Sequence, residues 1–211
     1  MSDTDHETAI AGAYGASTVN ELTQQYDTWV DTYNAEVAAL GYRLPWMVIA
    51  MFMRHVPQTT DPILDAGCGT GILGDSLATF AYSDIVGIDL SVPMLGHAKN
   101  LNVYSQLSQM TLGETLGFGD NTFNGVISAG VFTQGHAPYN SFDELIRTTK
   151  PGGHIVFSVR ESVYENDGFC EYQQSLVDTG KWRLTEVTAP CLAFTIGYQD
   201  VNVLIFAYQV V

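Results

Sequence analysis

The feature that most constrains the fold is a glycine-rich turn joining an apolar segment directly to a helical one. Residues 62–71 read PILDAGCGTG, and the helical spacing of apolar residues resumes from Ile72 to Phe80. Three alternate glycines, Gly67, Gly69 and Gly71, let the backbone turn sharply and approach a ligand that side chains would exclude. The pattern predicts a strand, a ligand-binding loop and a helix in succession.

The same alternation of strand and helix continues along the chain. DIVGIDL at 84–90 precedes a helix through Met94 and His97, and FNGVISAGVF at 123–132 precedes FDELIRTT at 142–149. KPGG at 150–153 is a turn signature, and HIVFSVR at 154–160 supplies another strand. Strands that alternate with helices favour parallel pairing and right-handed crossovers, so an α/β, doubly wound sheet is predicted.

The segments on either side of this region are expected to complete the fold. Residues 1–16 are polar and predicted to be flexible, whereas residues 17–57 are predicted to form a helical cap. A helix is expected around residues 170–179, and the closing segments WRLTEV and VNVLIFAYQVV are expected to pair antiparallel. The first cap helix carries an apolar stripe: Val19, Leu22, Tyr26, Trp29, Val30, Tyr33 and Val37.

Charge and cysteine content narrow the functional classes. Eight Lys and Arg residues against 23 Asp and Glu give a net charge of −15, which repels phosphate backbones and argues against a nucleic-acid substrate. Solubility or a saline habitat would explain the acidity without any partner. The longest apolar run, ten residues from Leu44 to Met53, is too short to span a membrane. Three separated cysteines suggest neither a disulfide framework nor a metal site, and they fit a cytoplasmic protein.

Two carboxylates indicate which ligand the glycine turn would hold. Asp89 ends the next strand, 22 residues after Gly67, where a carboxylate can accept hydrogen bonds from both hydroxyls of a ribose. Asp65 would repel a pyrophosphate and suits an ammonium group, although it could simply cap the following helix. A dehydrogenase fingerprint would place its third glycine where Ile72 stands. S-adenosylmethionine, which carries an ammonium, a sulfonium and a ribose, fits better.

The motifs LDAGCGTG, GIDLS, DNTFNGVISAG and KPGG, in that order, resemble those of class I S-adenosylmethionine-dependent methyltransferases. YDTWVDTYNAEVAALGYRLP and YSQLSQMTLGE are similar to segments of the Williams-Beuren-region methyltransferase-like family. The resemblance implies one domain over residues 1–211, with a core at 62–160 and a C-terminal helix and strands at 161–211. It also implies a Rossmann-like, mostly parallel seven-stranded sheet with an antiparallel last strand.

By motif position, the resemblance implies roles for particular residues. The backbone from Gly67 to Gly71, including Cys68 and Thr70, would hold the methionine part of the cofactor together with Asp65, and Asp89 would hold the ribose. Cys68 is otherwise a small packing residue. Leu90 and Met94 would flank the adenine, and Ala129 and Val131 would line the methionine side. Many relatives have an Asp after the third strand that binds the adenine amino group, whereas this sequence has Met110, Thr111 and Leu112, so a hydroxyl or backbone groups would bind it instead. Met94 could equally be ordinary core.

Substrate-side residues are expected on the cap and on the loop after the fourth strand. Tyr26, Trp29 and Tyr33 would close over the sulfonium, which aromatic faces attract, or would only pack in the core. Arg43 would bind the methionine carboxylate or lie on the surface. His136 would orient or deprotonate the acceptor, or serve only structurally.

Two functions remain open at this point. The leading hypothesis is an enzyme that passes a methyl group from S-adenosylmethionine to an oxygen, nitrogen or carbon of a small acceptor. The alternative is a non-catalytic module that binds S-adenosylmethionine and regulates a partner protein.

Overall fold

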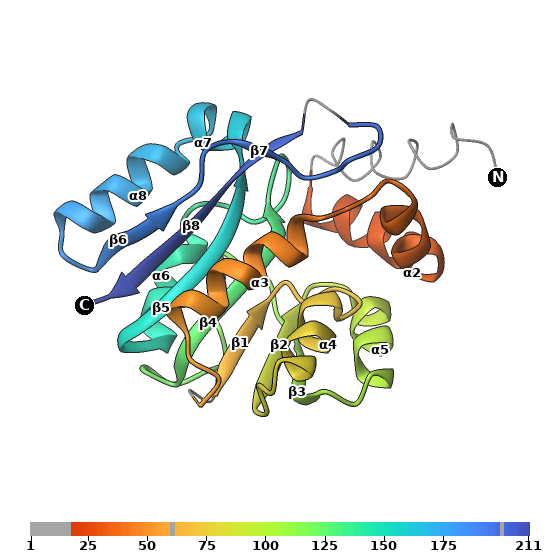
Figure 1. The fold of residues 1–211 in the computed structure, drawn as a ribbon, viewed down its shortest axis with the longest axis horizontal. Coiled ribbons are helices and arrows are strands. Elements are labelled where there is room, and N and C mark those ends of the chain that lie inside the picture. Colours follow the sequence, from red (N-terminus) through yellow and green to blue (C-terminus); the bar gives the residue numbers. More distant parts are fainter. Residues whose placement is uncertain (1–17, 60–61, 199–200) are drawn as a thin grey trace.

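The computed structural model describes residues 18–59, 62–198 and 201–211 (Figure 1). Its elements are α2 (Val19–Ala39), α3 (Leu44–His55), β1 (Ile63–Ala66), α4 (Ile72–Thr79), β2 (Ile85–Asp89), α5 (Val92–Asn100), β3 (Tyr104–Gln109), β4 (Phe123–Phe132), α6 (Ser141–Thr148), β5 (Thr149–Arg160), α7 (Glu161–Asn166), α8 (Phe169–Asp178), β6 (Trp182–Val187), β7 (Cys191–Leu192) and β8 (Asn202–Val210). The expected flexible start at 1–16 lies outside the described residues.

The strands of the described residues form one eight-stranded sheet in the order β3-β2-β1-β4-β5-β8-β6, with β7 paired to β8 beside this path. Seven strands were expected, and the two-residue β7 is the additional one. Strands β1 to β5 pair in parallel, whereas β8 runs antiparallel to both β5 and β6. The predicted α/β, Rossmann-like sheet with an antiparallel last strand is confirmed. The chain reverses its direction of travel across the sheet between β1 and β4.

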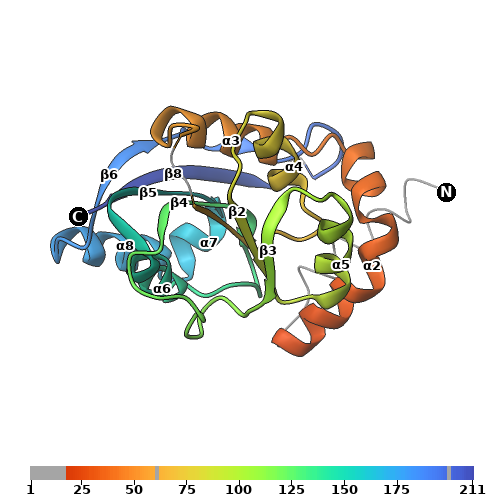
Figure 2. The same cartoon turned by 90° about the horizontal axis from the view of Figure 1, so that it is seen from below.

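Helices cover both faces of the sheet, as Figure 2 shows from below. One buried cluster joins α3 and α4 to the sheet, and the other joins α6, α7 and α8 to the opposite face. Neighbouring residues of a central strand face opposite layers, so Ile63 belongs to the first cluster and Leu64 to the second. Burial on both faces explains why these strands are continuous apolar runs.

The cap helix α2 begins with a local hydrogen bond and packs beside α5 (Figure 2). The Thr18 side chain accepts a hydrogen bond from the Glu21 amide at 3.2 Å, which caps the helix near its predicted start. Two side chains then fasten α2 to the sheet's loops. Ser91 donates to Asp27 at 2.5 Å, and Thr70 donates to Asn34 at 2.7 Å. The cap is therefore tied to the glycine turn and to the loop that follows β2.

The structure differs from the expected elements in three places. KPGG is an irregularity inside β5, where the register with β4 shifts between Phe123 paired to Thr149 and Gly125 paired to His154. The short helix α7 and strand β7 were not expected, because six and two residues are too few for a periodic signal. Among the described helices, none is both long and apolar enough to cross a membrane.

Candidate active site

A cavity lies at the carboxyl ends of the central strands, where the chain's direction across the sheet reverses. In open α/β sheets this crevice is the usual ligand-binding position. We call it the cofactor cavity, and α2, the β1 and β2 ends, the β3 loop and the β4 end form its walls. Its lining residues are Val19, Leu22, Tyr26, Tyr33, Gly67, Gly69, Asp89, Leu90, Met94, Met110, Thr111, Leu112, Ala129, Gly130, Val131, His136, Ala137 and Pro138.

The glycine turn is held by backbone hydrogen bonds to β2. The amides of Gly67 and Cys68 both donate to the Ile88 carbonyl, at 2.8 and 2.9 Å. Gly67 has φ +78°, and a Cβ built there would lie 2.3 Å from the Val131 side chain. Gly69 has φ +54°, and a Cβ there would meet nothing within 4 Å. Gly67 therefore permits tight packing, whereas Gly69 leaves space open beside the cavity.

Asp89 is oriented by two backbone amides. Its Oδ2 accepts from Gly69 N–H and its Oδ1 from Ser91 N–H, both at 2.9 Å. A carboxylate offers about four acceptor positions, so two remain for other donors. Burial raises the pKa of Asp89, the Ser91 and Gly69 amides oppose that rise, and the nearby Asp27 adds to it. A pair of ribose hydroxyls would supply the missing donors.

Asp65 lies behind the glycine turn and is fully buried. Its Oδ2 accepts a hydrogen bond from the Tyr104 hydroxyl at 2.7 Å, and its buried Oδ1 has no hydrogen-bond partner among the described residues. Burial raises the pKa of Asp65 to about 7, the Tyr104 hydroxyl counteracts the rise, and the negative charge of Asp89 adds to it. An unsatisfied buried oxygen of this kind favours a cationic or hydrogen-donating ligand.

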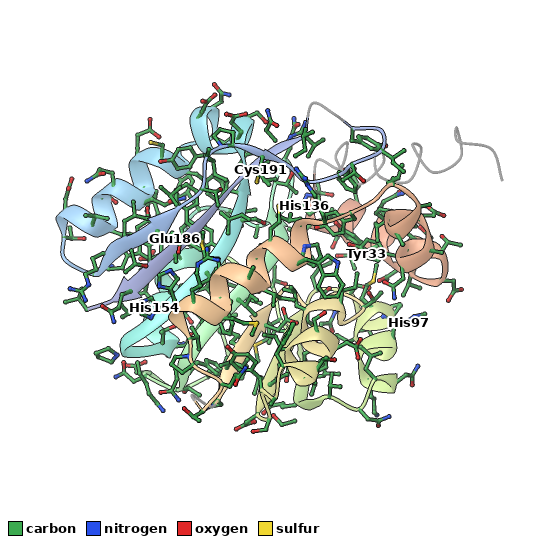
Figure 3. The ribbon with its side chains drawn as sticks, in the orientation of Figure 1. Tyr33, His97, His136, His154, Glu186 and Cys191 are labelled. Carbon is green, nitrogen blue, oxygen red and sulfur yellow. The ribbon has the colours of Figure 1, made fainter. Side chains whose placement is uncertain are left out.

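Tyr26 and His136 join the cap to the loop after β4. The Tyr26 hydroxyl lies 2.9 Å from His136 Nε2, and His136 Nδ1 lies 2.8 Å from the Gln134 carbonyl oxygen. Because that carbonyl can only accept, we assign the ring hydrogen to Nδ1, and Nε2 then accepts from Tyr26. Burial lowers the pKa of His136, which favours this neutral form. Figure 3 shows His136 on the same side of the molecule as Tyr33, far from His154 and Glu186.

A second cavity adjoins the first and shares Tyr26, Tyr33 and Gly130 with it. We call it the acceptor cavity. It lies between α2, the ends of β4 and β5, and residues 193–194 and 201–203. Its other lining residues are Trp29, Val37, Tyr42, Leu44, Phe132, Thr133, Ser158, Arg160, Ala193, Phe194, Val201 and Val203. Sequence reasoning did not identify this cavity, because its walls come from segments far apart in the chain.

The structure brings most of the predicted site residues to the cofactor cavity. Its lining includes the predicted Tyr26, Tyr33, Gly67, Gly69, Asp89, Leu90, Met94, Thr111, Leu112, Ala129 and His136. Their roles toward a ligand stay predictions. Sequence reasoning missed Gly130, Ala137 and Pro138, and it placed Val19 and Leu22 on the apolar stripe without assigning them to the site. Their spacing on that stripe was the available signal.

Six predicted residues do not line the cofactor cavity, and one of them, Trp29, lines only the acceptor cavity. Arg43 donates from Nε to the Leu192 carbonyl at 2.8 Å, so its guanidinium is held at β7. Cys68 is buried, and burial raises the pKa of its thiol. The Thr70 hydroxyl donates a hydrogen bond to Asn34 Oδ1, and Gly71 is the N-cap of α4 in a left-handed conformation. The sixth is Asp65, which is fully buried next to the glycine turn.

The residues at the cofactor cavity fit S-adenosylmethionine. Gly69 leaves room for a close approach, and Asp89 keeps two acceptor positions for a ribose. Apolar side chains of Leu90 and Met94 line the wall where an adenine would lie. Tyr26 and Tyr33 present aromatic rings, which attract a sulfonium cation.

Comparisons with known proteins agree with this geometry. The family model described as a methyltransferase domain matches residues 64–157. Human methyltransferase-like protein 27 is 31% identical over 173 residues, which cover 81% of this chain and 69% of that protein.

Solved structures share the fold. A chain in the complex between the Haloferax volcanii Trm112 methyltransferase activator and a methyltransferase has a TM-score of 0.70 and 17% identity, covering 89% of this chain and 96% of that one. A TehB-like SAM-dependent methyltransferase from Corynebacterium glutamicum has a TM-score of 0.64 and 19% identity, covering 89% and 99%. The chain therefore belongs to the class I S-adenosylmethionine-dependent methyltransferases, and S-adenosylmethionine is its cofactor.

Proposed function

We propose that this methyltransferase acts on a small-molecule acceptor that binds in the acceptor cavity. The observation that supports this most is the contact between the two cavities at Tyr26, Tyr33 and Gly130. An acceptor in the second cavity would face the cofactor across these residues. The cavity is lined by α2 and by residues next to β7 and β8, which suits a compact molecule better than a polymer. The net charge of −15 independently disfavours a nucleic acid.

The chain's residues would contribute positioning and a route for a proton. When bound, S-adenosylmethionine supplies a methyl group on a sulfonium: the acceptor's lone pair forms the new bond, and the electrons of the broken C–S bond stay on sulfur. An acceptor hydroxyl or amine must also lose a proton. Tyr26 lines both cavities and donates to His136 Nε2, so its oxygen can take that proton as His136 takes the tyrosine's.

Methyl transfer into a metabolite extract tests this function. The full chain is incubated with methyl-labelled S-adenosylmethionine and an extract of small molecules, and labelled products are separated by mass. We expect label in a small molecule. Tyr26→Phe and His136→Phe should each lower kcat by about 10²- to 10⁴-fold if they carry the proton. Tyr164→Phe, at a tyrosine that lines neither cavity, should leave kcat unchanged.

Two results would contradict the proposal. Label that enters only protein or nucleic acid would exclude a small acceptor. Tight S-adenosylmethionine binding without transfer to any fraction would favour the alternative, a non-catalytic module that regulates a partner. A cytoplasmic location belongs to the same proposal, because Cys68, Cys170 and Cys191 are all free thiols.

A further inference from the structure

The wall of the acceptor cavity is largely aromatic and reaches the junction with the cofactor cavity. The rings of Tyr42 and Phe194 stack at a centroid distance of 4.8 Å, and those of Trp29 and Tyr33 meet edge to face, also at 4.8 Å. A Cβ built on Gly130 would lie 2.5 Å from the Tyr42 hydroxyl, so this ring extends to the glycine that lines both cavities. Packed ring pairs present flat surfaces of fixed position. A planar molecule lying against them would have one end at the cofactor.

This cavity offers no uncommitted charge among the residues that the structure describes. Its described lining contains no Asp, Glu or Lys, and its one arginine, Arg160, already interacts within the chain. The buried Glu36 does not line the cavity and accepts a hydrogen bond from the Trp29 indole at 2.8 Å. Moving a charged group from water into such a place without an opposite charge to pair with is strongly unfavourable. The acceptor should therefore be uncharged.

Ser158 places a hydroxyl at the junction of the two cavities. Its neighbours Phe157 and Val159 pack in the layer of α6, α7 and α8, so its own side chain faces the opposite layer, where the acceptor cavity lies. The residue is only 2% exposed, and its Oγ accepts from the Gly130 amide at 3.0 Å. The hydroxyl hydrogen of Ser158 has no acceptor among the described residues, so it is available to a ligand.

Thr133 supplies a second hydroxyl to the same end of the cavity. It follows Phe132, which pairs with Val159 next to Ser158, so the two hydroxyl-bearing residues lie at neighbouring strand ends. Thr133 Oγ1 is buried and has no hydrogen-bond partner among the described residues. A buried hydroxyl without a partner is costly, and a ligand oxygen that accepts its hydrogen bond would remove that cost.

Resting on the proposed function, we propose that the acceptor is an uncharged, planar aromatic molecule with a hydrogen-bond-accepting oxygen beside the atom that is methylated. Its ring lies against the stacked pair of Tyr42 and Phe194. Its oxygen accepts from Ser158, because that hydroxyl contacts Gly130 at the junction, and Thr133 donates at the same polar edge. Ligand sites commonly combine an apolar wall with a few placed polar groups, as this cavity does. The oxygen serves for recognition and is unchanged in the product.

Two phenols test the accepting oxygen. 2-Methoxyphenol and 2-ethylphenol share the ring, the hydroxyl and the overall shape, but only the first has an ether oxygen beside the hydroxyl. Each is titrated calorimetrically into the full chain saturated with S-adenosylhomocysteine. We expect 2-methoxyphenol to bind about threefold or more tightly, because 2-ethylphenol leaves the two cavity hydroxyls without an acceptor.

Variants of the two hydroxyls show whether they cause this preference. Ser158→Ala and Thr133→Val should each lower the ratio of the two affinities about twofold or more. Thr133→Ser keeps a hydroxyl and should keep the ratio. Ser76→Ala, at a buried serine of α4 that lines neither cavity, is the matched control and should also keep it.

Thr133→Val keeps the test decisive if Ser158→Ala folds poorly. The substitution removes an unpartnered buried hydroxyl with little change in shape, so it should raise the melting temperature of the free protein by about 2–4 °C. A purely structural threonine would not combine this gain with weaker binding of 2-methoxyphenol. Equal binding of the two phenols, or a preference that neither cavity variant lowers, overturns the inference.

A second pair of probes tests the charge of the acceptor. 4-Hydroxy-3-methoxybenzamide and 4-hydroxy-3-methoxybenzoate have nearly the same shape, and at pH 7 only the second is an anion. The uncharged amide should bind about tenfold or more tightly to the same complex, since the cavity has no uncommitted cation to pair with the carboxylate. Equal or tighter binding of the acid overturns the uncharged acceptor.

Products of the metabolite-extract assay separate this inference from the proposed function. The labelled products are passed over an anion exchanger and a cation exchanger after methyl transfer. Label in small molecules that neither exchanger retains supports an uncharged acceptor. Label only in small molecules that an exchanger retains overturns this inference and leaves the proposed function intact. Label only in macromolecules overturns both.

Discussion

At the scale of single residues, Asp65 combines complete burial with an unsatisfied oxygen. In the cofactor-free protein its pKa is raised to about 7, because burial disfavours the charged form more than the Tyr104 hydroxyl supports it. The folded chain therefore holds a proton on Asp65 that the unfolded chain, with its ordinary pKa of 3.8, has already released. Stability falls as the pH rises through this window, between about 4 and 7.

Asp65→Asn should remove this pH dependence. The amide keeps an acceptor for Tyr104 and carries no charge, so at pH 8 the cofactor-free variant should be more stable by up to about 4 kcal/mol. Urea denaturation at pH 5 and pH 8 measures the difference, with Asp75→Asn, at an exposed acid of α4, as the control. Equal pH slopes for Asp65→Asn and the wild type would contradict the explanation. If Asp65 holds the ammonium of the cofactor, affinity for S-adenosylmethionine should fall in the same variant.

The pH dependence of methyl transfer should report on His136. Its base form is the neutral ring, and burial lowers its pKa from the ordinary value of 6.5. Activity should therefore be flat from pH 7 upward and should decline only below 6.5, as the ring becomes protonated. A rate profile of kcat against pH measures this. A half-maximal point above 6.5 would contradict the role assigned to His136.

Site residues could be predicted where a short stretch of sequence determines their position, and could not be predicted where contacts between distant segments determine it. The roles of Gly69 and Asp89 depend on backbone geometry within two consecutive strand ends, so a short motif was enough to place both at the cavity. Arg43 does not line the cofactor cavity, because its long side chain reaches Leu192, almost 150 residues further on. The acceptor cavity could not be predicted for the same reason, because its lining residues come from α2, β4, β5 and β8.

At the scale of elements, a substitution in the glycine turn should affect ligand affinity more than it affects stability. Gly69→Ala and Gly180→Ala both force alanine into a left-handed conformation, with φ of +54° and +70°, and neither new methyl meets an atom within 4 Å. Each should cost about 1 kcal/mol of stability. Only Gly69 lines the cofactor cavity, so only Gly69→Ala should weaken S-adenosylhomocysteine binding, by tenfold or more. Equal affinities of the two variants in calorimetry would contradict the placement of the cofactor.

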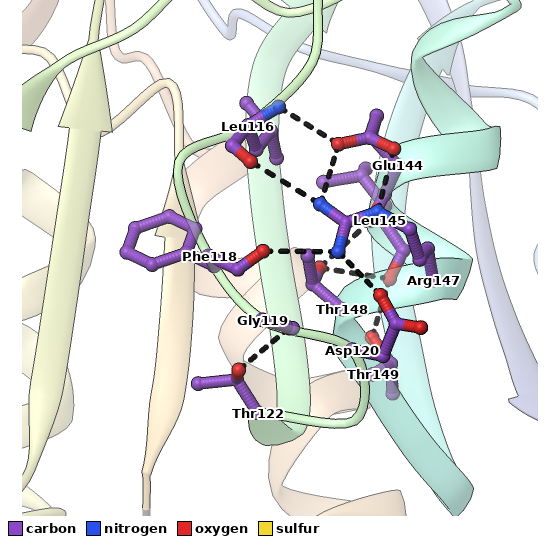
Figure 4. Close-up of polar contacts among 10 residues, drawn as sticks. All are labelled: Leu116, Phe118, Gly119, Asp120, Thr122, Glu144, Leu145, Arg147, Thr148 and Thr149. Atoms are coloured by element: carbon purple, nitrogen blue, oxygen red, sulfur yellow. Dashed lines mark hydrogen bonds and ion pairs between the residues drawn. The ribbon is translucent and has the colours of Figure 1, made fainter.

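The loop after β3 is held by one arginine of α6, as Figure 4 shows. Arg147 donates to Glu144, to Asp120 and to the carbonyls of Phe118 and Leu116, at distances from 2.6 to 3.2 Å. Glu144 in turn accepts from the Leu116 amide at 2.7 Å. This network fixes the end of a loop that begins with three lining residues of the cofactor cavity.

Arg147→Lys should therefore loosen the loop, because an ammonium cannot reproduce the planar fork. We expect a loss of about 1–2 kcal/mol in the free energy of unfolding and a weaker affinity for S-adenosylhomocysteine. Arg54→Lys alters an arginine that pairs with Glu186 and is half exposed, so it should cost less than about 1 kcal/mol and leave affinity unchanged. Equal losses in the two variants would argue against the network's role.

Most elements could be predicted because their signals are periodic and long enough. Strand β4 matches its expected range, helix α4 begins at the expected Ile72 and ends one residue early, and helix α8 is shifted by one residue at both ends. The KPGG segment was predicted to be a turn before a strand, but it lies inside β5. Its residues give the same turn signal whether the chain leaves the sheet or forms a bulge within a strand. The position of β8 inside the sheet depends on long-range pairing, which no local pattern encodes.

At the scale of the whole molecule, the excess of acidic residues should make stability depend on salt. A net charge of −15 opposes compaction through self-repulsion, whereas exposed ion pairs contribute at most about 1 kcal/mol each. Salt should therefore weaken the repulsion among the acidic residues more than it weakens the attraction within the ion pairs. The melting temperature should rise by several degrees between 0.05 and 1 M NaCl, and KCl should have the same effect. A melting temperature that falls with salt would show that the ion pairs dominate.

The insertion of β8 between β5 and β6 has a consequence for synthesis of the chain. On the ribosome, both neighbours emerge before the strand that joins them, so the nascent chain carries an unpaired edge of β5 rich in Ile155, Phe157 and Val159. Such an edge invites pairing with other chains. A premature stop codon before Asn202 would make that state permanent, and the truncated product should depend on chaperones or aggregate.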